Sequence, residues 1–361
     1  MVERVKLHYV YDYTDVDRAF WAEHLEDWVP RRLVDAHQHL VDPALRREPM
    51  TEAMRRSFWV NEVNEPMSAE TVERCMRIVY PGREVTPIAF AYPDLAYDIE
   101  ASNAYVSQEC ARRGWYALAL VRPQWDRRQV EALLGLPGVI GVKPYYSLIS
   151  HDPHTRDRHL ESSIFDFLPH ELLEVLNERH AWVTLHVPRA ARLGHPENLR
   201  EIRELRRRYP RVVTVIAHLG RCYTEPHARE ALPHLADDAG LYFDISAVLN
   251  PAVLRLALKC IGPERLLYGT DNPVFFMRGR RTWEGRQYIN HTSHDFFFNR
   301  GRHEPPEVEA RYTLYMYEAL RALKEACGDL GISGAGVEGI FRDNAERLIA
   351  GVLAGKRSAA R

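Results

Sequence analysis

The sequence has few lysines, few cysteines and no long apolar run. Only five of its 361 residues are lysine, so 43 of its 48 basic residues are arginine. These arginines are scattered among acidic residues, and the formal net charge is −2. A chain with this charge lacks the basic surface that nucleic acid or an anionic membrane would require. No stretch approaches the roughly 18 apolar residues of a membrane-spanning helix, so we expect neither nucleic acid nor a membrane as a partner.

The cysteines lack the spacing of a disulfide framework or of a Cys-x-x-Cys metal site. They are odd in number and scattered, which is typical of a protein in a reducing compartment. Their positions are Cys75, Cys110, Cys222, Cys260 and Cys327. Residues 1–20 contain no apolar stretch of the kind found in signal peptides. We therefore expect a soluble, cytoplasmic protein.

Eight short apolar runs, rich in β-branched and aromatic residues, alternate with segments of helical periodicity. The runs are mostly apolar along their whole length, which is typical of parallel strands buried on both faces. They cover residues 33–39, 85–92, 115–123, 139–146, 181–188, 212–220, 241–246 and 266–273. The helical segments include 98–113, 170–180, 197–210, 226–238 and 251–260. This α/β pattern predicts a (β/α)8 TIM barrel or a large doubly wound sheet. No glycine-rich dinucleotide-binding fingerprint follows the first run, which favours the barrel.

We expect the whole chain, residues 1–361, to form one domain with long insertions after strands 1 and 8. The first insertion spans 41–84 and the second spans 272–305. Loops of this length are usually functional lids or disordered segments. The second insertion is rich in aromatic residues, so we expect a packed cap. Two further helices are predicted towards the C-terminus, at 306–327 and 343–354.

Ionisable side chains occur near the C-terminal ends of five predicted strands. His37 and His39 end the first strand, and residues two apart on a strand point to the same side. The others are Lys143, His186, His218 and Asp271, at the ends of the fourth, fifth, sixth and eighth strands. Barrel enzymes carry their active sites on this face. Three imidazoles and a carboxylate make a ligand set suited to Zn²⁺, with Mn²⁺ or Fe²⁺ as alternatives.

These residues lie in motifs that resemble the amidohydrolase superfamily. Within it, the similarity is to the amidohydrolase 2 group, which includes aminocarboxymuconate semialdehyde decarboxylase and resorcylate decarboxylases. The motifs are D-A-H-Q-H (35–39), G-V-K-P (141–144), L-H-V (185–187), I-A-H-L-G (216–220), Y-G-T-D-N-P (268–273) and N-A-E-R-L (344–348). A His-x-His pair alone is a weak signal, whereas this ordered set covers nearly the whole chain.

The resemblance implies a role for each of these residues. His37, His39 and His186 would be neutral ligands of one metal ion. Asp271 would bind that ion weakly, or accept the proton of its water. His218 would be the acid or base on the substrate side. Asp35 would orient one of the ligand imidazoles.

Lys143 is the ambiguous member of the set. In family members with two metals, a carboxylated lysine at this position bridges them, whereas the group resembled here usually holds one metal. We expect one metal ion, with Lys143 lining the substrate site. The alternative is a buried ion pair with Asp244 or Asp271.

Other residues are weaker candidates for substrate binding. Arg122 follows the third strand, and with an arginine cluster in the second insertion it could clamp a carboxylate, although surface solvation explains such a cluster equally well. The cluster is Arg278, Arg280 and Arg281. Tyr145 could line an aromatic pocket, as could Trp59, Trp125 and Tyr146, or all four could be packing residues. His291 and His294 either reach the substrate from the cap or make hydrogen bonds within the loop.

The predicted ligands are compatible with more than one function. The main hypothesis is hydrolysis of a C–N or C–O bond, such as that of an amide or a lactone, by a metal-activated water. The alternative is non-oxidative decarboxylation of an aromatic or unsaturated carboxylic acid, which needs a cationic clamp and an aromatic slot beside the metal. A non-catalytic ligand-binding barrel is disfavoured because every ligand position is occupied by a suitable residue. The expected partner is a small-molecule substrate, and the oligomeric state stays open, with a homodimer as one option.

Overall fold

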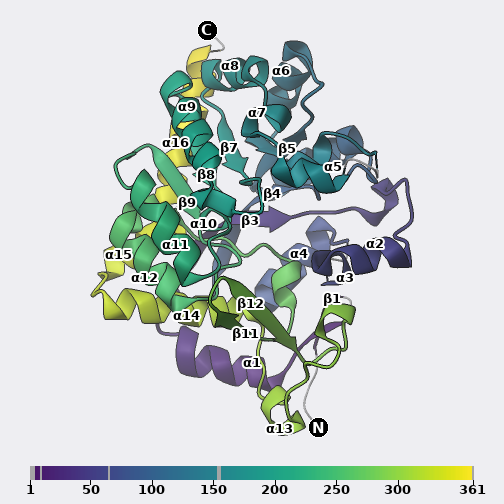
Figure 1. Cartoon of the computed structure of the whole chain (residues 1–361), viewed down its shortest axis with the longest axis vertical. Helices are drawn as coiled ribbons and strands as arrows, with labels where there is room; N and C mark the ends of the chain where they lie inside the picture. Colours follow the sequence, from purple (N-terminus) through teal and green to yellow (C-terminus); the bar gives the residue numbers. More distant parts are fainter. Residues whose placement is uncertain (1–4, 9, 64–65, 153–155, 360–361) are drawn as a thin grey trace.

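The computed structural model describes residues 5–8, 10–63, 66–152 and 156–359. At its centre lies an eight-stranded parallel sheet, whose strands neighbour one another in the order in which they occur in the sequence (Figure 1). The strands are β3 (Arg32–His39), β4 (Glu84–Phe90), β5 (Tyr116–Val121), β6 (Val139–Pro144), β7 (Trp182–Leu185), β8 (Val213–Ile216), β9 (Leu241–Asp244) and β10 (Leu266–Leu267).

The first and last strands of the sheet meet, so that the sheet closes into a barrel. The amide of Ala36 donates to the carbonyl of Tyr268 at 2.9 Å, and the amide of Asp271 donates to the carbonyl of His37 at 2.8 Å. A parallel bridge also joins Gln38 to Asn272. The predicted (β/α)8 barrel is therefore confirmed, and its closing seam passes directly through the His-x-His motif.

The strands are short apolar segments buried on both faces, as their composition predicts. Every residue of β6 and β7 is buried. Helices cover the outside of the barrel (Figure 1). They include α5 (Ile99–Arg113), α6 (Arg127–Gly135), α8 (His170–Glu178), α9 (Pro196–Arg208), α11 (Glu225–Ala231) and α12 (Pro251–Cys260). The C-terminal helix α16 (Asn344–Ala359) instead packs against β3, β6 and β10, in a separate cluster of buried strand residues. Capping places their ends: the side chain of Asp98 accepts from the amide of Ala101 at the start of α5, and Gly114 ends α5 with a φ of 69°.

The prediction of one helix over 306–327 was wrong. Two helices occupy this region, α13 (Pro306–Glu309) and α14 (Tyr315–Asp329). Between them the chain is extended because it pairs with the second insertion. The carbonyl of Thr313 accepts from the amide of Gly279 at 3.0 Å, and Leu314 bridges Arg278.

Both insertions are folded, and they contact each other. The first contains α2 (Glu52–Ser57), α3 (Trp59–Val63) and α4 (Ala69–Val79). The second contains a β-hairpin formed by β11 (Gly279–Glu284) and β12 (Gln287–Thr292). The carboxylate of Glu62 accepts from the amides of Phe297 and Phe298, and the rings of Trp59 and Phe298 lie 5.7 Å apart. The insertions thus form a joint cap. None of the helices in the described part of the chain is long and apolar enough to span a membrane.

Candidate metal centre

A cavity of about 570 Å³ opens at the C-terminal ends of the barrel strands. Its wall contains ten of the residues singled out from the sequence. These are His37, His39, Trp59, Lys143, Tyr145, Tyr146, His186, His218, Asp271 and Arg281. The insertions supply two of them, Trp59 from α3 and Arg281 from the hairpin. Because parallel strands end on one face, predicted ligands that lie more than 200 positions apart in the sequence meet in one cavity.

The side chains of His37, His39 and Asp271 converge on one point. Oδ1 of Asp271 lies 3.6 Å from Nε2 of His37 and 3.3 Å from Nε2 of His39. One potential ligand atom from each residue lies within 4.8 Å of the other two. Asp271 has a φ of 62°, in the left-handed region that aspartate tolerates better than most residues. This turn directs its carboxylate towards the two imidazoles.

In the neutral form of each imidazole, its hydrogen bond leaves Nε2 without a proton. Nδ1 of His37 lies 2.9 Å from Oδ2 of Asp244, and Nδ1 of His39 lies 3.4 Å from the carbonyl of Ala91. Both partners are acceptors, so each Nδ1 carries the hydrogen and each neutral ring has its lone pair on Nε2. Two such lone pairs and the oxygen of Asp271 therefore face one another. This donor set fits a divalent cation, which would replace repulsion between acceptors with coordination.

His186 lies beside this group rather than within it. Its ring is 4.5 Å from that of Tyr145 and 5.4 Å from that of His218. Its buried Nδ1 has no hydrogen-bond partner among the described residues, and its Nε2 lies 3.4 Å from the hydroxyl of Tyr145. Burial and the neighbouring charge of Lys143 hold the pKa of His186 well below its usual value. The imidazole is consequently neutral, the form that binds a metal.

His218 is held by Ser246 and Asp244. Nδ1 of His218 lies 2.8 Å from Oγ of Ser246, whose hydroxyl donates in turn to Asp244. Because that hydroxyl hydrogen is engaged, Oγ accepts from Nδ1, and Nε2 of His218 is left as a free base. Burial lowers the pKa of His218 to about 4. The cavity thus holds an unprotonated imidazole at neutral pH.

Asp35 does not orient a ligand ring. Its Oδ1 accepts from the backbone amides of His37 and Thr270, and its Oδ2 accepts from the hydroxyl of Thr270. The prediction that Asp35 positions an imidazole was wrong, because its carboxylate accepts hydrogen bonds from the backbone amides and the threonine hydroxyl at the closing seam. The carboxylate that binds the ring of His37 is Asp244.

Lys143 is fully buried in the cavity wall and unpaired. No hydrogen bond or ion pair of its Nζ is found among the described residues, and its amine lies 5.3 Å from the ring centre of Phe90. Burial lowers its pKa to about 8, although the charges of Asp244 and Asp271 act in the opposite direction. The alternative of a direct ion pair with either carboxylate is therefore not what the structure contains.

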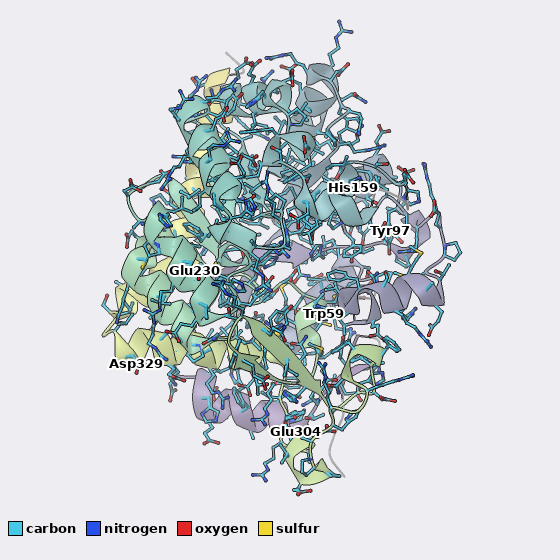
Figure 2. The ribbon with its side chains drawn as sticks, in the orientation of Figure 1. Trp59, Tyr97, His159, Glu230, Glu304 and Asp329 are labelled. Carbon is cyan, nitrogen blue, oxygen red and sulfur yellow. The ribbon has the colours of Figure 1, made fainter. Side chains whose placement is uncertain are left out.

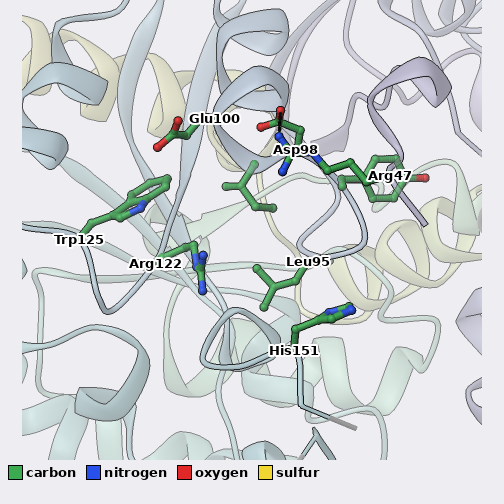
Figure 3. A pocket seen from close by; sticks show the side chains of 9 residues that line it. Arg47, Leu95, Asp98, Glu100, Arg122, Trp125 and His151 are labelled. Atoms are coloured by element: carbon green, nitrogen blue, oxygen red, sulfur yellow. Dashed lines mark hydrogen bonds and ion pairs between the residues drawn. The ribbon is translucent and has the colours of Figure 1, made fainter.

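Several candidates lie outside this cavity. Arg122 and Trp125 line a separate cavity of about 390 Å³, which they share with His151 (Figure 3). His291 is engaged with the hydroxyl of Thr282 at 2.9 Å. His294 is likewise absent from the cavity wall, and its ring packs on that of Phe296 at 4.5 Å.

Of the arginine cluster, only Arg281 reaches the metal-site cavity. Arg278 pairs with the buried Asp17, and Arg280 pairs with Glu304. Arg192 and Arg221, which the sequence reasoning missed, also line the cavity. Arg221 follows the I-A-H-L-G motif directly, so its position was a usable signal. Arg192 lies in a loop without any motif.

Comparison with known proteins identifies the family. A sequence model of the family described as Amidohydrolase matches residues 34–350. The chain belongs to the amidohydrolase family. It is accordingly an enzyme, and the resemblance seen in its motifs is confirmed.

Solved structures share the amidohydrolase fold. An amidohydrolase from Burkholderia multivorans with bound zinc is 13% identical, with a TM-score of 0.53 over 88% of this chain and 99% of that one. The 5-carboxyvanillate decarboxylase of Sphingomonas paucimobilis is 15% identical, with a TM-score of 0.52 over 89% of this chain and 99% of that one. No curated protein sequence matched.

Proposed function

We propose that this amidohydrolase is a metal-dependent hydrolase that cleaves an amide or a lactone in a small organic substrate. The observation that carries the proposal is the convergence of three acceptor atoms, Nε2 of His37, Nε2 of His39 and Oδ1 of Asp271. Unprotonated groups that could accept a proton surround this point. The cavity volume of about 570 Å³ is that of a small-molecule site.

In this proposal, one divalent metal is held by His37, His39 and Asp271, with His186 as a further ligand. When bound, the metal would lower the pKa of a water molecule towards ~7 and so supply hydroxide at neutral pH. Zn²⁺ suits imidazole and carboxylate ligands, with Mn²⁺ and Fe²⁺ as alternatives. The zinc in the Burkholderia multivorans structure supports this choice.

The residues of the chain would then move the protons. Oδ1 of Asp271 is the carboxylate oxygen that faces Nε2 of both His37 and His39, and it would take the proton from the attacking water. Nε2 of His218 is a free base in the same cavity and would accept a hydrogen bond from the attacking water or from the N–H of an amide substrate. The unpaired amine of Lys143 would bind a substrate oxygen.

The protonation states favour hydrolysis over decarboxylation. A decarboxylase needs an acid that protonates the carbon losing CO₂, whereas a hydrolase needs a base for water. Burial lowers the pKa of His218 to about 4, and the neighbouring imidazoles keep the pKa of Asp271 below its usual value despite its burial. Both residues are therefore bases at neutral pH.

Decarboxylation of an aromatic acid remains the second candidate, and a specific observation favours it. Aromatic rings and arginines line the same cavity, as a carboxylated ring would require. The aromatic residues include Tyr92, Tyr145, Tyr146, Tyr223 and Tyr288. The arginines are Arg192, Arg221 and Arg281.

Metal analysis combined with a substrate screen tests the proposal. We expect about one equivalent of Zn, Mn or Fe per chain, and cleavage of members of a panel of lactones and amides that stops on chelation and returns with metal. Release of CO₂ from aromatic acids, without any hydrolysis, would establish the second candidate instead. Purified protein that holds no stoichiometric metal would overturn both.

A further inference from the structure

Three arginine side chains line the cavity that contains the candidate metal centre. Arg192 and Arg221 come from the loops after β7 and β8, and Arg281 comes from the hairpin. Arg281 is only 5% exposed. No ion pair within the described part of the chain includes any of the three. Other arginines of the second insertion are paired, such as Arg280 with Glu304 and Arg286 with Glu230, both glutamates being labelled in Figure 2.

Each of the three guanidinium groups is anchored through Nη1 to a main-chain carbonyl, and Nε of Arg281 also donates to Oδ1 of Asn290 at 2.9 Å. Nη1 of Arg192 donates to the carbonyl of Arg221 at 3.0 Å, and Nη1 of Arg221 donates to that of Arg189 at 2.8 Å. Nη1 of Arg281 donates to the carbonyl of Ala247 at 3.0 Å. No hydrogen bond of any of the three Nη2 atoms is found among the described residues. Each fork is thus fixed in direction and keeps donors for a further acceptor.

Two of the three positive charges, those of Arg192 and Arg281, pack on the same aromatic ring, and the charge of Arg221 acts on Arg192. The ring of Tyr223 has the guanidinium of Arg192 at 5.4 Å and that of Arg281 at 5.7 Å from its centre. Arg281 lies 4.3 Å from the ring centre of Tyr288. Burial and the charge of Arg221 lower the pKa of Arg192. Like charges crowded against aromatic walls repel one another unless an anion lies among them.

Among the described wall residues, Asp271 is the only carboxylate that faces the ligand imidazoles, and those imidazoles and a cation would engage it. Asp94 also lines the cavity, but its Oδ1 accepts from the amide of Ala96. The charge that would balance the arginines must therefore come mostly from a ligand. Guanidinium forks bind carboxylates in a bidentate manner, and three forks offer more donors than one carboxylate can accept.

We propose that Arg192, Arg221 and Arg281 form an anion-binding wall that selects substrates carrying at least two carboxylates. This inference rests on the proposed function, because it names the class of substrate that the proposed hydrolase would cleave. The substrate would be a small di- or tricarboxylic lactone or amide. Its bond to be cleaved would face His37 and His39, and its carboxylates would lie against the arginine wall. A phosphate group would satisfy the same donors, so the test separates the two anions.

Calorimetric titration of the purified full-length protein tests the wall without any need for turnover. The probes are tricarballylate, glutarate, butyrate and inorganic phosphate, each added before and after chelation of the metal. We expect the di- and tricarboxylates to bind about tenfold or more tightly than butyrate or phosphate. We also expect their binding to persist after chelation and to weaken with added salt.

Arg281→Gln is expected to weaken glutarate binding about tenfold or more. Arg280→Gln, its neighbour on the same strand, serves as the matched control and should bind like the wild type. Arg281 is buried, so its replacement could disturb folding. Arg221→Gln therefore serves as a second variant that lacks a guanidinium group, and Arg281→Lys keeps the positive charge but lacks the guanidinium group. The melting temperature of each variant reports whether it is folded.

Several results would overturn the proposal. One is that Arg281→Gln and Arg221→Gln bind glutarate as tightly as the wild type does. Another is that chelation of the metal alone abolishes the binding of glutarate. The proposal also fails if phosphate binds more tightly than glutarate, or if none of the probes binds. None of these bears on whether a metal hydrolyses a substrate. Conversely, a protein without stoichiometric metal that still binds glutarate through Arg281 would retain the wall and lose the proposed function.

Discussion

The carboxylate of Asp244 orients two imidazoles that the sequence assigns to different tasks. Its Oδ2 lies 2.9 Å from Nδ1 of His37, a predicted metal ligand. Its Oδ1 accepts from the amide of His218 at 2.9 Å and from the hydroxyl of Ser246, which holds the His218 ring. A carboxylate behind a ligand imidazole fixes its tautomer and raises its basicity.

Replacing this carboxylate should therefore lower the metal affinity, although Asp244 is not itself a predicted metal ligand. Asp244→Asn is expected to reduce metal affinity about 10- to 100-fold, because the neutral amide polarises the His37 ring less strongly. Competition with a chromophoric chelator measures the change. Asp237→Asn, an exposed aspartate, is the control. Unchanged affinity in Asp244→Asn would show that His37 is not a ligand oriented by this residue.

The free Nε2 of His218 predicts a separation of metal binding from turnover. His218→Asn should retain the metal and lose about 10²- to 10⁴-fold in kcat, the usual contribution of a general base. Metal content by mass spectrometry and steady-state kinetics on the same preparation provide the two readouts. If the variant instead loses its metal, His218 is a ligand and the assignment of its role fails.

The buried amine of Lys143 predicts a pH-dependent stability. Its pKa is about 8 in the folded chain, against 10.5 for an exposed lysine, so the unfolded chain binds more protons between these values. Wild-type stability should consequently rise with pH through this window. Lys143→Met removes that dependence, and its stability relative to wild type should fall by about 2.5 kcal/mol between pH 7 and pH 10.

Denaturant unfolding of both proteins at several pH values measures this difference. Lys259→Met, at an exposed lysine, should show no such trend. A constant difference between Lys143→Met and wild type would mean that the amine is not held in a desolvated site.

Gly269 is placed where a side chain would displace a predicted ligand. A Cβ at this position would lie 2.9 Å from Cβ of His37 and 3.3 Å from Cβ of Ser246. Gly269→Ala is expected to cost about 1–3 kcal/mol and to weaken metal binding, because the His37 backbone must shift. Thermal melting and chelator competition measure both effects. Gly351→Ala, within α16 and with no neighbouring atom within 4 Å, should leave metal binding unchanged and should not lower the melting temperature, because alanine favours a helix over glycine.

The barrel and the core of the site could be predicted from the sequence because both depend on periodicity. Parallel strands buried on both faces give continuous apolar runs, and their C-terminal ends meet on one face. His37, His39, His218 and Asp271 all lie at or just beyond such ends, so their convergence follows from the fold.

The ends of the strands were less predictable. The run 266–273 is apolar enough to resemble a full strand, yet β10 contains only Leu266 and Leu267. Beyond it the backbone turns through a positive φ at Asp271. Local propensity carries little information about such a turn, because the tertiary contacts of the site stabilise it.

The residues contributed by loops could not be assigned. Arg192 and Arg281 reach the cavity from segments with no periodic pattern, whereas Arg122, His291 and His294 have suitable chemistry but lie elsewhere. Only the three-dimensional course of the insertions separates these two groups. Arg280 and Arg281 illustrate the point, since adjacent residues of β11 have different partners.

The hairpin formed by β11 and β12 has a consequence for how this enzyme could diversify. Arg281 and Tyr288 reach the cavity from this ribbon, whereas the predicted metal ligands all belong to the barrel or to its closing seam. Mutations within residues 279–292 could therefore alter which molecules are accepted without disturbing the reactive centre. In a laboratory setting, the same separation makes this ribbon the natural segment to randomise when a new substrate range is sought.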